Sequence, residues 1–165
     1  MISTLRGYPS AMRGIGIGAL AGLVGGAAEV AWVLLYASLS DADAAAVARG
    51  VVASLSPLMA ASPLAVGFGL TIHMVLALAL GVVVTLSMGA LLPRRVSDTV
   101  RSAVVVAVLV AVWAVNFLVV LPVVHPQFVA LLPYGASLAS KVLFGLAAAV
   151  VLRVSDGAGA GDARI

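Results

Sequence analysis

Four long apolar stretches, separated by short segments richer in polar residues, organise this chain. They cover about residues 14–39, 64–92, 102–124 and 134–152. Each is long enough to cross a hydrocarbon core about 30 Å thick as an α-helix, which takes about 20 residues. Prolines, which cannot continue a helix, stand near the ends of the stretches, at Pro63, Pro93, Pro122 and Pro133. The pattern predicts an all-α, polytopic membrane protein built as a four-transmembrane-helix bundle.

The composition strengthens this prediction. Hydrophobic residues make up 64% of the chain and charged residues only 9%, whereas soluble domains carry about a quarter charged residues. A soluble domain of this size cannot hide so much apolar surface, so lipid is the expected surrounding. The chain has no cysteine, which excludes disulfides, thiolate catalysis and cysteine-bound metal. The nine basic residues are scattered rather than gathered in a stripe with aromatic residues, so no nucleic-acid partner is expected.

The basic residues outside the apolar stretches fall almost entirely on one side of a chain that crosses four times. One side holds Arg6, Arg13, Arg94, Arg95, Arg101, Arg153 and Arg164, and the other holds Arg49. Because loops rich in Lys and Arg stay in the cytoplasm, both termini are predicted to be cytoplasmic, in a bacterial inner membrane. The expected parts are a cytoplasmic N-terminus over 1–13, a membrane domain over 14–152 and a disordered cytoplasmic tail over 153–165.

Two segments join the stretches on the predicted outer side. In residues 40–62, apolar side chains recur at helical spacing, at Ala44, Val47, Val51, Leu55 and Leu58. Ser40 or Asp41 can cap such a helix, with Asp43 in its first turn. The pattern predicts a short amphipathic helix lying on the outer membrane face. Residues 123–132 are nearly apolar and are expected to dip toward the headgroups.

Small or polar residues recur at every fourth position in all four stretches. The series are Gly14, Gly18, Gly22 and Gly26; Gly69, His73, Ala77, Gly81, Thr85 and Gly89; Ala103, Ala107 and Ala111; and Ser137, Lys141 and Gly145. Small residues at this spacing let helix backbones approach closely, so each series is expected to mark the buried face of its helix. Two interpretations of the first helix's glycine face remain open. It packs within the bundle, or it mediates homo-oligomerisation or docks a partner from a membrane complex.

Each stretch also contains one strongly polar side chain, and these four are Glu29, His73, Asn116 and Lys141. With a rise of 1.5 Å per residue, all four lie roughly 10–15 Å from the outer ends of their helices. Polar groups at bilayer depth are costly and are therefore candidate functional residues. We expect them to converge as a polar cluster in the outer half of the membrane. Three further residues are candidates for an outer cap above this cluster: Trp32, Tyr36 and His125.

Three interpretations of the polar cluster remain open. One is a structural network in which Glu29 and Lys141 form an ion pair and the other groups satisfy the remaining hydrogen bonds. Another is a proton or solute pathway, in which Glu29 and His73 titrate and Lys141 attracts an anion. The third is a bound haem or metal ion with His73 and His125 as ligands. No catalytic constellation of side chains is recognised, so enzymatic activity is not expected.

The chain resembles small uncharacterised bacterial four-helix membrane proteins in two motifs. These are Ile72-His73-Met74-Val75-Leu76 leading to Gly81, and Lys141-Val142-Leu143-Phe144-Gly145. The resemblance implies the fold and no activity. Ser140-Lys141 stands where a second histidine of such proteins is expected, so a two-histidine site is not carried over. Two classes of function follow: a small transporter or channel-like protein that uses the polar cluster, or a non-catalytic accessory subunit that assembles a larger membrane complex.

Overall fold

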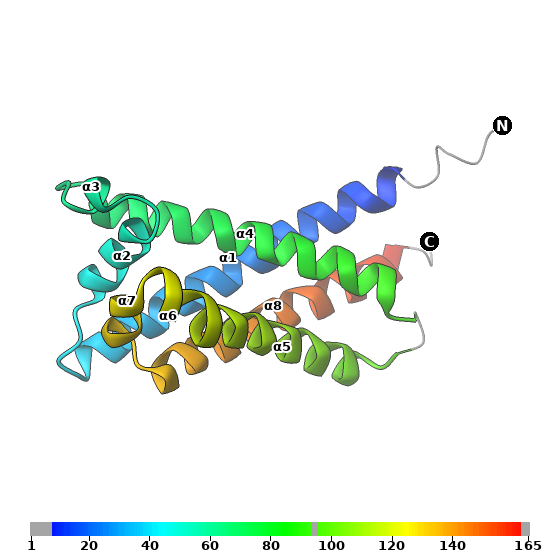
Figure 1. Cartoon of the computed structure of the whole chain (residues 1–165). Helices are drawn as coiled ribbons and strands as arrows, with labels where there is room; N and C mark the ends of the chain where they lie inside the picture. The colour runs from blue at the N-terminus through cyan, green and yellow to red at the C-terminus, as the bar shows by residue number, and fades with distance from the viewer. Residues whose placement is uncertain (1–7, 94–95, 163–165) are drawn as a thin grey trace.

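The protein consists of helices joined by short connections, as a computed structural model shows (Figure 1). The structure describes residues 8–93 and 96–162. Four helical segments in this part of the chain are long and apolar enough to cross a membrane, over Ala11–Ser38, Ala65–Leu91, Asp98–Val124 and Tyr134–Ser155. The predicted all-α, four-helix fold is confirmed, and the protein is a multi-pass membrane protein.

Three of the membrane spans are single helices, and the third span is a composite. The single helices are α1 (Tyr8–Ser38), α4 (Ala65–Leu91) and α8 (Tyr134–Asp162). The third span joins α5 (Asp98–Val115), the π-helix η1 (Asn116–Val120) and α6 (Leu121–Val124). Shorter helices fill the connections, namely α2 (Ala44–Ala53), α3 (Pro57–Ala60) and α7 (Pro126–Leu131).

The chain alternates between the two ends of the bundle. The start of α1, the end of α4 and the start of α5 lie at one end, and α2, α3, α6 and α7 gather at the other (Figure 1). Arg13, at the first of these ends, donates a hydrogen bond to the carbonyl of Ser155 over 3.3 Å and links α1 to α8. We call the end with α2 and α7 the outer end, following the distribution of arginine.

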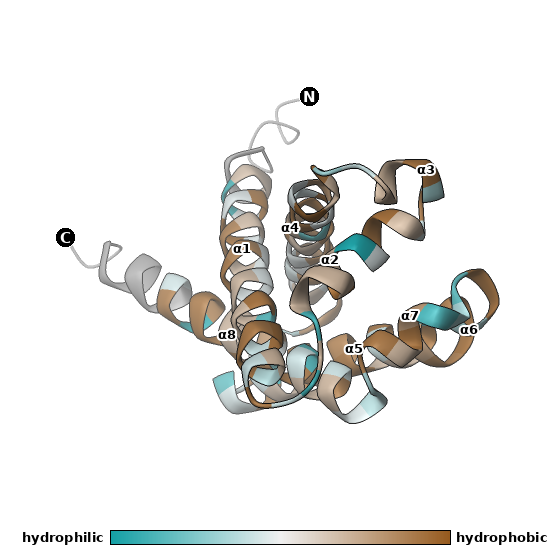
Figure 2. Cartoon of the chain, turned by 90° about the vertical axis from the view of Figure 1, so that its left-hand side faces the viewer, coloured by the Kyte–Doolittle hydropathy of each residue, from teal (hydrophilic) through white to brown (hydrophobic). Residues whose placement is uncertain are grey.

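The four spans form an open arrangement rather than a closed square. Helix α1 packs along both α4 and α8, and α5 packs along α8, whereas α4 and α5 make few contacts with each other. The view along the bundle from the outer end shows α1 between α4 and α8, with α5 beside α8 (Figure 2). One side of α5 is therefore left uncovered by the described helices along most of its length.

Glycine brings α1 and α4 into backbone contact. A Cβ atom at Gly18 would lie 2.7 Å from the Cα of Val82, and one at Gly81 would lie 2.5 Å from the Cα of Gly22. Only residues without a side chain fit at such a crossing. The glycine face of α1 is thus filled by this chain's own helices. Gly18, Gly22 and Gly26 are buried, which agrees with the interpretation that this face packs within the bundle, whereas docking of a second protein by α1 stays a prediction.

The small-residue rule fails on the third span. Ala103, Ala107 and Ala111 are exposed, whereas Val105 and Leu109 are fully buried against α8. The small residues of this interface come from the partner helix, because a Cβ atom at Gly145 of α8 would lie 3.1 Å from the Cα of Val106. A large side chain on one helix needs a small one opposite, so a single helix's pattern does not identify its buried face.

Apolar side chains form two cores along the bundle. The inner core contains Ala21, Ala77, Val84, Met88, Val105, Leu109, Phe144, Ala148 and Leu152. The outer core contains Val47, Phe117, Leu121, Phe128, Leu132 and Ala136. The first joins all four spans, and the second ties the outer helices α2 and α7 to the third span and to the start of α8.

The short helix predicted in the outer segment is confirmed as α2, and it packs closely on the bundle. Asp43, rather than Ser40 or Asp41, caps α2, because its carboxylate accepts a hydrogen bond from the amide of Ala45 over 2.8 Å. Two glycines explain why α2 sits so close to its neighbours. Gly69 of α4 lies against the carbonyl of Ala48, and a Cβ atom at Gly50 would lie 2.7 Å from the ring of Phe128. Residues 123–132, predicted to dip inward, form α6 and α7.

Two helix features differ from the sequence prediction. The π-helix lies just before Pro122, which has no amide hydrogen and whose ring would clash with the carbonyl of Leu118 in a regular helix. A local change to i→i+5 bonding, with the amide of Leu121 bound to the carbonyl of Asn116, relieves that conflict. At the other end of the chain, α8 continues to Asp162, past the expected end at Leu152, since no proline interrupts it.

Candidate functional site

A buried carboxylate forms the centre of the site. Glu29 lies on the inward face of α1, and only 6% of its surface is exposed. Its Oε1 atom lies 2.8 Å from Nζ of Lys141 on α8. The hydroxyl of Ser140 lies 3.4 Å from the same oxygen, although its single proton is directed mainly at the carbonyl of Ser137 over 2.8 Å. One oxygen of the carboxylate therefore faces two side chains from the same turn of α8.

The other carboxylate oxygen faces a histidine. Nε2 of His73, on α4, lies 3.9 Å from Oε2 of Glu29 and 3.4 Å from the carbonyl oxygen of Gly26. Because a carbonyl only accepts, the hydrogen bond to Gly26 requires the proton of a neutral imidazole to sit on Nε2. Nδ1 is then left with a free lone pair. The side chain of His73 is 29% exposed, so this ring is the most accessible member of the group.

The ammonium group of Lys141 has a charged partner on one side and an aromatic ring on another. Nζ lies 5.0 Å from the centroid of the Phe144 ring, within the range of a cation–π contact. The ring is held in place by the α1 backbone, because a Cβ atom at Gly25 would lie 2.7 Å from it. Among the described residues, Glu29 is the only hydrogen-bonding partner of Nζ.

A hydrogen-bonded turn of α8 connects this group to two tryptophans. Ser140 donates to the carbonyl of Ser137 over 2.8 Å, and the hydroxyl of Ser137 accepts a bond from the indole of Trp113 over 3.0 Å. From the other side, the indole of Trp32 donates to the carbonyl of Ala136 over 2.9 Å. The two indoles thus fix the start of α8 between α1 and α5, which sets the depth at which Lys141 meets Glu29.

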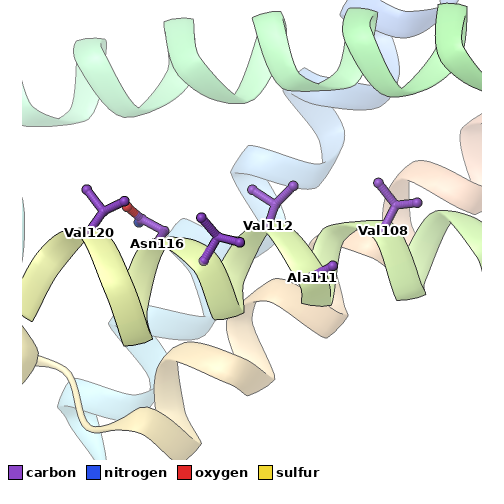
Figure 3. Close-up of a pocket in the computed structure, with 6 residues that line it drawn as sticks. Val108, Ala111, Val112, Asn116 and Val120 are labelled. Atoms are coloured by element: carbon purple, nitrogen blue, oxygen red, sulfur yellow. The ribbon is translucent and has the colours of Figure 1, made fainter.

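Asn116 does not join the other three polar residues. Its side chain is exposed and lies in a groove on α5 and η1 that is lined by Val108, Ala111, Val112, Val115 and Val120. These side chains project from the side of α5 that is turned toward α4 (Figure 3). The inward positions of this span are instead Val105, Leu109 and Phe117, which follow an i, i+4 ridge next to Asn116.

The three residues considered as an outer cap have different surroundings. Trp32 lies next to the polar group through its bond to α8. Tyr36 packs against the outer core. Nδ1 of His125 lies 3.2 Å from the hydroxyl of Ser54, between the short helices α2 and α7 at the outer end. Because Ser54 donates its own proton to the carbonyl of Gly50, the histidine must donate in this pair.

The geometry does not favour a metal or haem site. In the part of the chain that the structure describes, no three His, Cys, Asp or Glu side chains are placed to hold a metal ion. His73 and His125 contact different groups, one in the membrane and one between α2 and α7. An ammonium group also occupies Oε1 of Glu29, and its charge opposes a cation beside it.

Comparisons with protein-family models, with curated proteins and with solved structures found no match. The resemblance to small bacterial four-helix proteins therefore stays a prediction, and the function has to be inferred from the chemistry of the site itself.

Three residues of the site were not among the sequence candidates. Ser140 and Phe144 flank Lys141 on the same face of α8, and Gly25 makes room for the ring of Phe144. Positions 137, 140, 141 and 144 follow the i, i+3, i+4 and i+7 spacing of one helix face, which is a signal that the sequence contains. Gly25 has no such signal, since it lies outside the series of glycines at every fourth position.

Proposed function

We propose that this protein is a small membrane transport protein with a proton-binding site made of Glu29, His73 and Lys141. One observation carries the proposal. Lys141 holds one oxygen of the buried carboxylate, with the hydroxyl of Ser140 beside it, while the other oxygen faces, among the described residues, the partly exposed imidazole of His73. A purely structural ion pair needs no titratable group beside it. Histidine is the side chain whose ordinary titration lies in the physiological range, which suits it to pass protons.

The hydrogen bonds suggest a route for the proton. Nδ1 of His73 carries the free lone pair and takes up a proton from the accessible side, which produces an imidazolium ion. That ion then gives the proton on Nε2 to Oε2 of Glu29, after the two atoms approach from 3.9 Å to hydrogen-bonding distance. The imidazole is left with its proton on Nδ1, and release of the proton to water and uptake at Nε2 restore the starting form.

The inner core argues for a gated carrier rather than an open pore. Below the polar group, large side chains such as Leu109 and Phe144 are fully buried, with apolar neighbours from all four spans. A proton bound at Glu29 therefore reaches the inner end only after these helices rearrange. Such a change of access around a fixed site near the middle of the membrane is typical of transporters.

Proton uptake by reconstituted protein tests this function. The protein is placed in liposomes with a pH-sensitive dye inside, and the outside medium is made more acidic than the lumen. Wild type is expected to acidify the lumen, and Glu29→Gln and His73→Ala are expected to lose that flux. His125→Ala is the matched control, since this histidine contacts Ser54 and not Glu29. Equal flux in the wild type and Glu29→Gln, with tryptophan fluorescence showing that both are folded, would refute the proposal.

A second function, assembly with another copy of this chain, is favoured by the environment of Asn116. Its amide is exposed among valine and alanine side chains and has no hydrogen bond to any described residue. An amide both donates and accepts, so two copies of Asn116 can pair with each other across a symmetric interface. Asparagine side chains hydrogen-bond between helices in membranes in this way.

Cross-linking tests the assembly. Because the chain has no cysteine, Val112→Cys in the groove gives a single reactive thiol, and Val83→Cys on the exposed side of α4 gives a matched control. Oxidation in liposomes is expected to produce a disulfide-linked dimer only with the first variant. Adding Asn116→Leu is expected to remove that dimer. An unchanged dimer in the absence of Asn116 would refute the amide pairing.

A further inference from the structure

The charges at the site sum to zero. Glu29 contributes one negative charge and Lys141 one positive charge, and the two lie 2.8 Å apart. His73 adds no charge when its ring is neutral, with the proton that faces the carbonyl of Gly26 on Nε2. An unbalanced charge at this depth is costly, so the group is expected to exchange ligands only in ways that keep its total charge at zero.

Neutrality restricts what can bind with the proton. A proton alone leaves the group with one net positive charge, and an anion alone leaves it with one net negative charge. A proton and a monovalent anion together leave the sum unchanged. We infer that the site of Glu29, His73 and Lys141 binds a small monovalent anion together with one proton. This inference rests on the proposed proton-binding function and names its co-substrate.

Lys141 supplies the anion-binding group. An ammonium ion has three donors, and Nζ uses one described hydrogen-bonding partner, Oε1 of Glu29. The ring of Phe144 beside it attracts the cation but cannot accept two further conventional hydrogen bonds. The side chain of Lys141 is 17% exposed, so its remaining donors are partly accessible to a ligand.

The exchange can be written as a balanced sequence. His73 delivers a proton to Glu29, which becomes a neutral carboxylic acid. Lys141 then loses its charged partner, and the arriving anion takes its place beside Nζ. On release, the anion departs, Glu29 returns its proton through His73, and the ion pair of Glu29 and Lys141 forms again. One proton and one anion move together, and no net charge moves with them.

The side chains next to Lys141 are closely packed, which favours a small anion. The ring of Phe144 is 1% exposed, and Gly25 contacts it so closely that no added methyl group fits. The nearby start of α8 is pinned by both tryptophans. Nitrate and acetate are therefore suitable probes. Nitrate has the further advantage that it does not itself take up a proton near neutral pH, so any pH dependence belongs to the protein.

Nitrate binding at several pH values tests the inference without any mutation. The chain contains one lysine, so ¹⁵N-labelled lysine reports on Lys141 alone. Nitrate is expected to shift this signal, and its affinity is expected to fall as the pH rises, by up to about tenfold per pH unit, because one proton accompanies each anion. A nitrate affinity that does not change with pH, or a lysine signal that does not respond to nitrate, would overturn it.

Charge variants separate this inference from the proton-binding function. Glu29→Gln leaves Lys141 without its carboxylate, so nitrate is expected to bind at every pH without a proton. Lys141→Met is expected to abolish nitrate binding, whereas Lys141→Arg keeps the positive charge and is expected to bind nitrate. If the wild type takes up protons but Lys141→Met binds nitrate as tightly as it does, the anion inference fails and the proton function stands. If the wild type neither takes up protons nor binds nitrate, the anion inference and the proton-binding function both fail.

Discussion

The crossing of α1 and α4 gives a sharp prediction about stability, with the protein supplying its own controls. Alanine at Gly81 would place a Cβ atom 2.5 Å from the Cα of Gly22, and alanine at Gly22 would place one 2.8 Å from the Cα of Leu78. Ordinary contacts at such positions are 3.4–4 Å. The clashing atoms belong to the backbone on both sides, so no side chain can turn away. The two helices must separate by about 1 Å instead.

The cost can be estimated from these contacts. Overpacking of a tight interface costs about 1–3 kcal/mol. Gly16 and Gly89 lie on the same two helices, with nothing within 4 Å of the added atom. Alanine there avoids the clash and is favoured in a helix interior by up to about 1 kcal/mol. The propensity gain is common to both variants, so we expect Gly81→Ala to be less stable than Gly89→Ala by about 1–3 kcal/mol, and Gly22→Ala to differ from Gly16→Ala in the same direction.

Unfolding in mixed micelles with increasing sodium dodecyl sulfate measures these differences. Tryptophan fluorescence is a suitable signal, because both indoles hydrogen-bond the start of α8 and lose that environment on unfolding. Each crossing variant is compared with the control on its own helix. Equal stability of Gly81→Ala and Gly89→Ala would show that the two backbones do not meet at Gly81.

Three further substitutions have expected outcomes at the site itself. Gly25→Ala should displace the buried ring of Phe144 and lower the free energy of unfolding by about 1–3 kcal/mol, measured by the same titration; an unchanged midpoint would contradict the close contact. Ser140→Ala should cost about 1 kcal/mol, because its bond to Ser137 is lost, while nitrate binding persists, since Lys141 keeps its charge. Trp32→Phe should also cost about 1 kcal/mol and leave proton flux measurable in liposomes; complete loss of flux would assign the indole a direct role.

The sequence predicted the four spans because their length and hydropathy are set by the thickness of the bilayer rather than by tertiary contacts. It also singled out three of the residues that meet at the site. Glu29, His73 and Lys141 each lie next to small residues that let helices approach, so a shared depth and face brought them together.

The sequence could not place Asn116, for a physical reason. In a soluble protein the exposed face of a helix is polar and its buried face is apolar. In a membrane both the lipid-facing and the buried face can consist of valine and alanine. The face of α5 that packs on α8 was therefore not marked by its own residues, and the alanine series that seemed to mark it is exposed. The π-helix before Pro122 further alters which side chains share a face in this span.

The packing of the outer segment, residues 40–62, could not be predicted from its sequence either. The periodic apolar residues of the segment correctly indicated a helix, but a helix on the membrane surface and one packed on the bundle have the same pattern. Gly50 and Gly69 let α2 contact both α7 and α4, which the apolar period alone does not predict. Such pairs of positions, distant in the sequence, become visible only when the helices are placed together.

The protonation of Glu29 tests the central claim most directly. The chain contains a single glutamate, so ¹³C labelling of that amino acid gives one carboxyl signal without mutation. Infrared difference spectra are recorded in liposomes as the pH falls from about 8 to about 5, the range in which an ordinary imidazole changes charge. We expect the ¹³C carboxylate band to convert into a protonated carboxyl band when nitrate is present, because nitrate supplies the negative charge that offsets the added proton. A carboxylate that stays ionised throughout, with and without nitrate, would mean that Glu29 and Lys141 form only a structural ion pair.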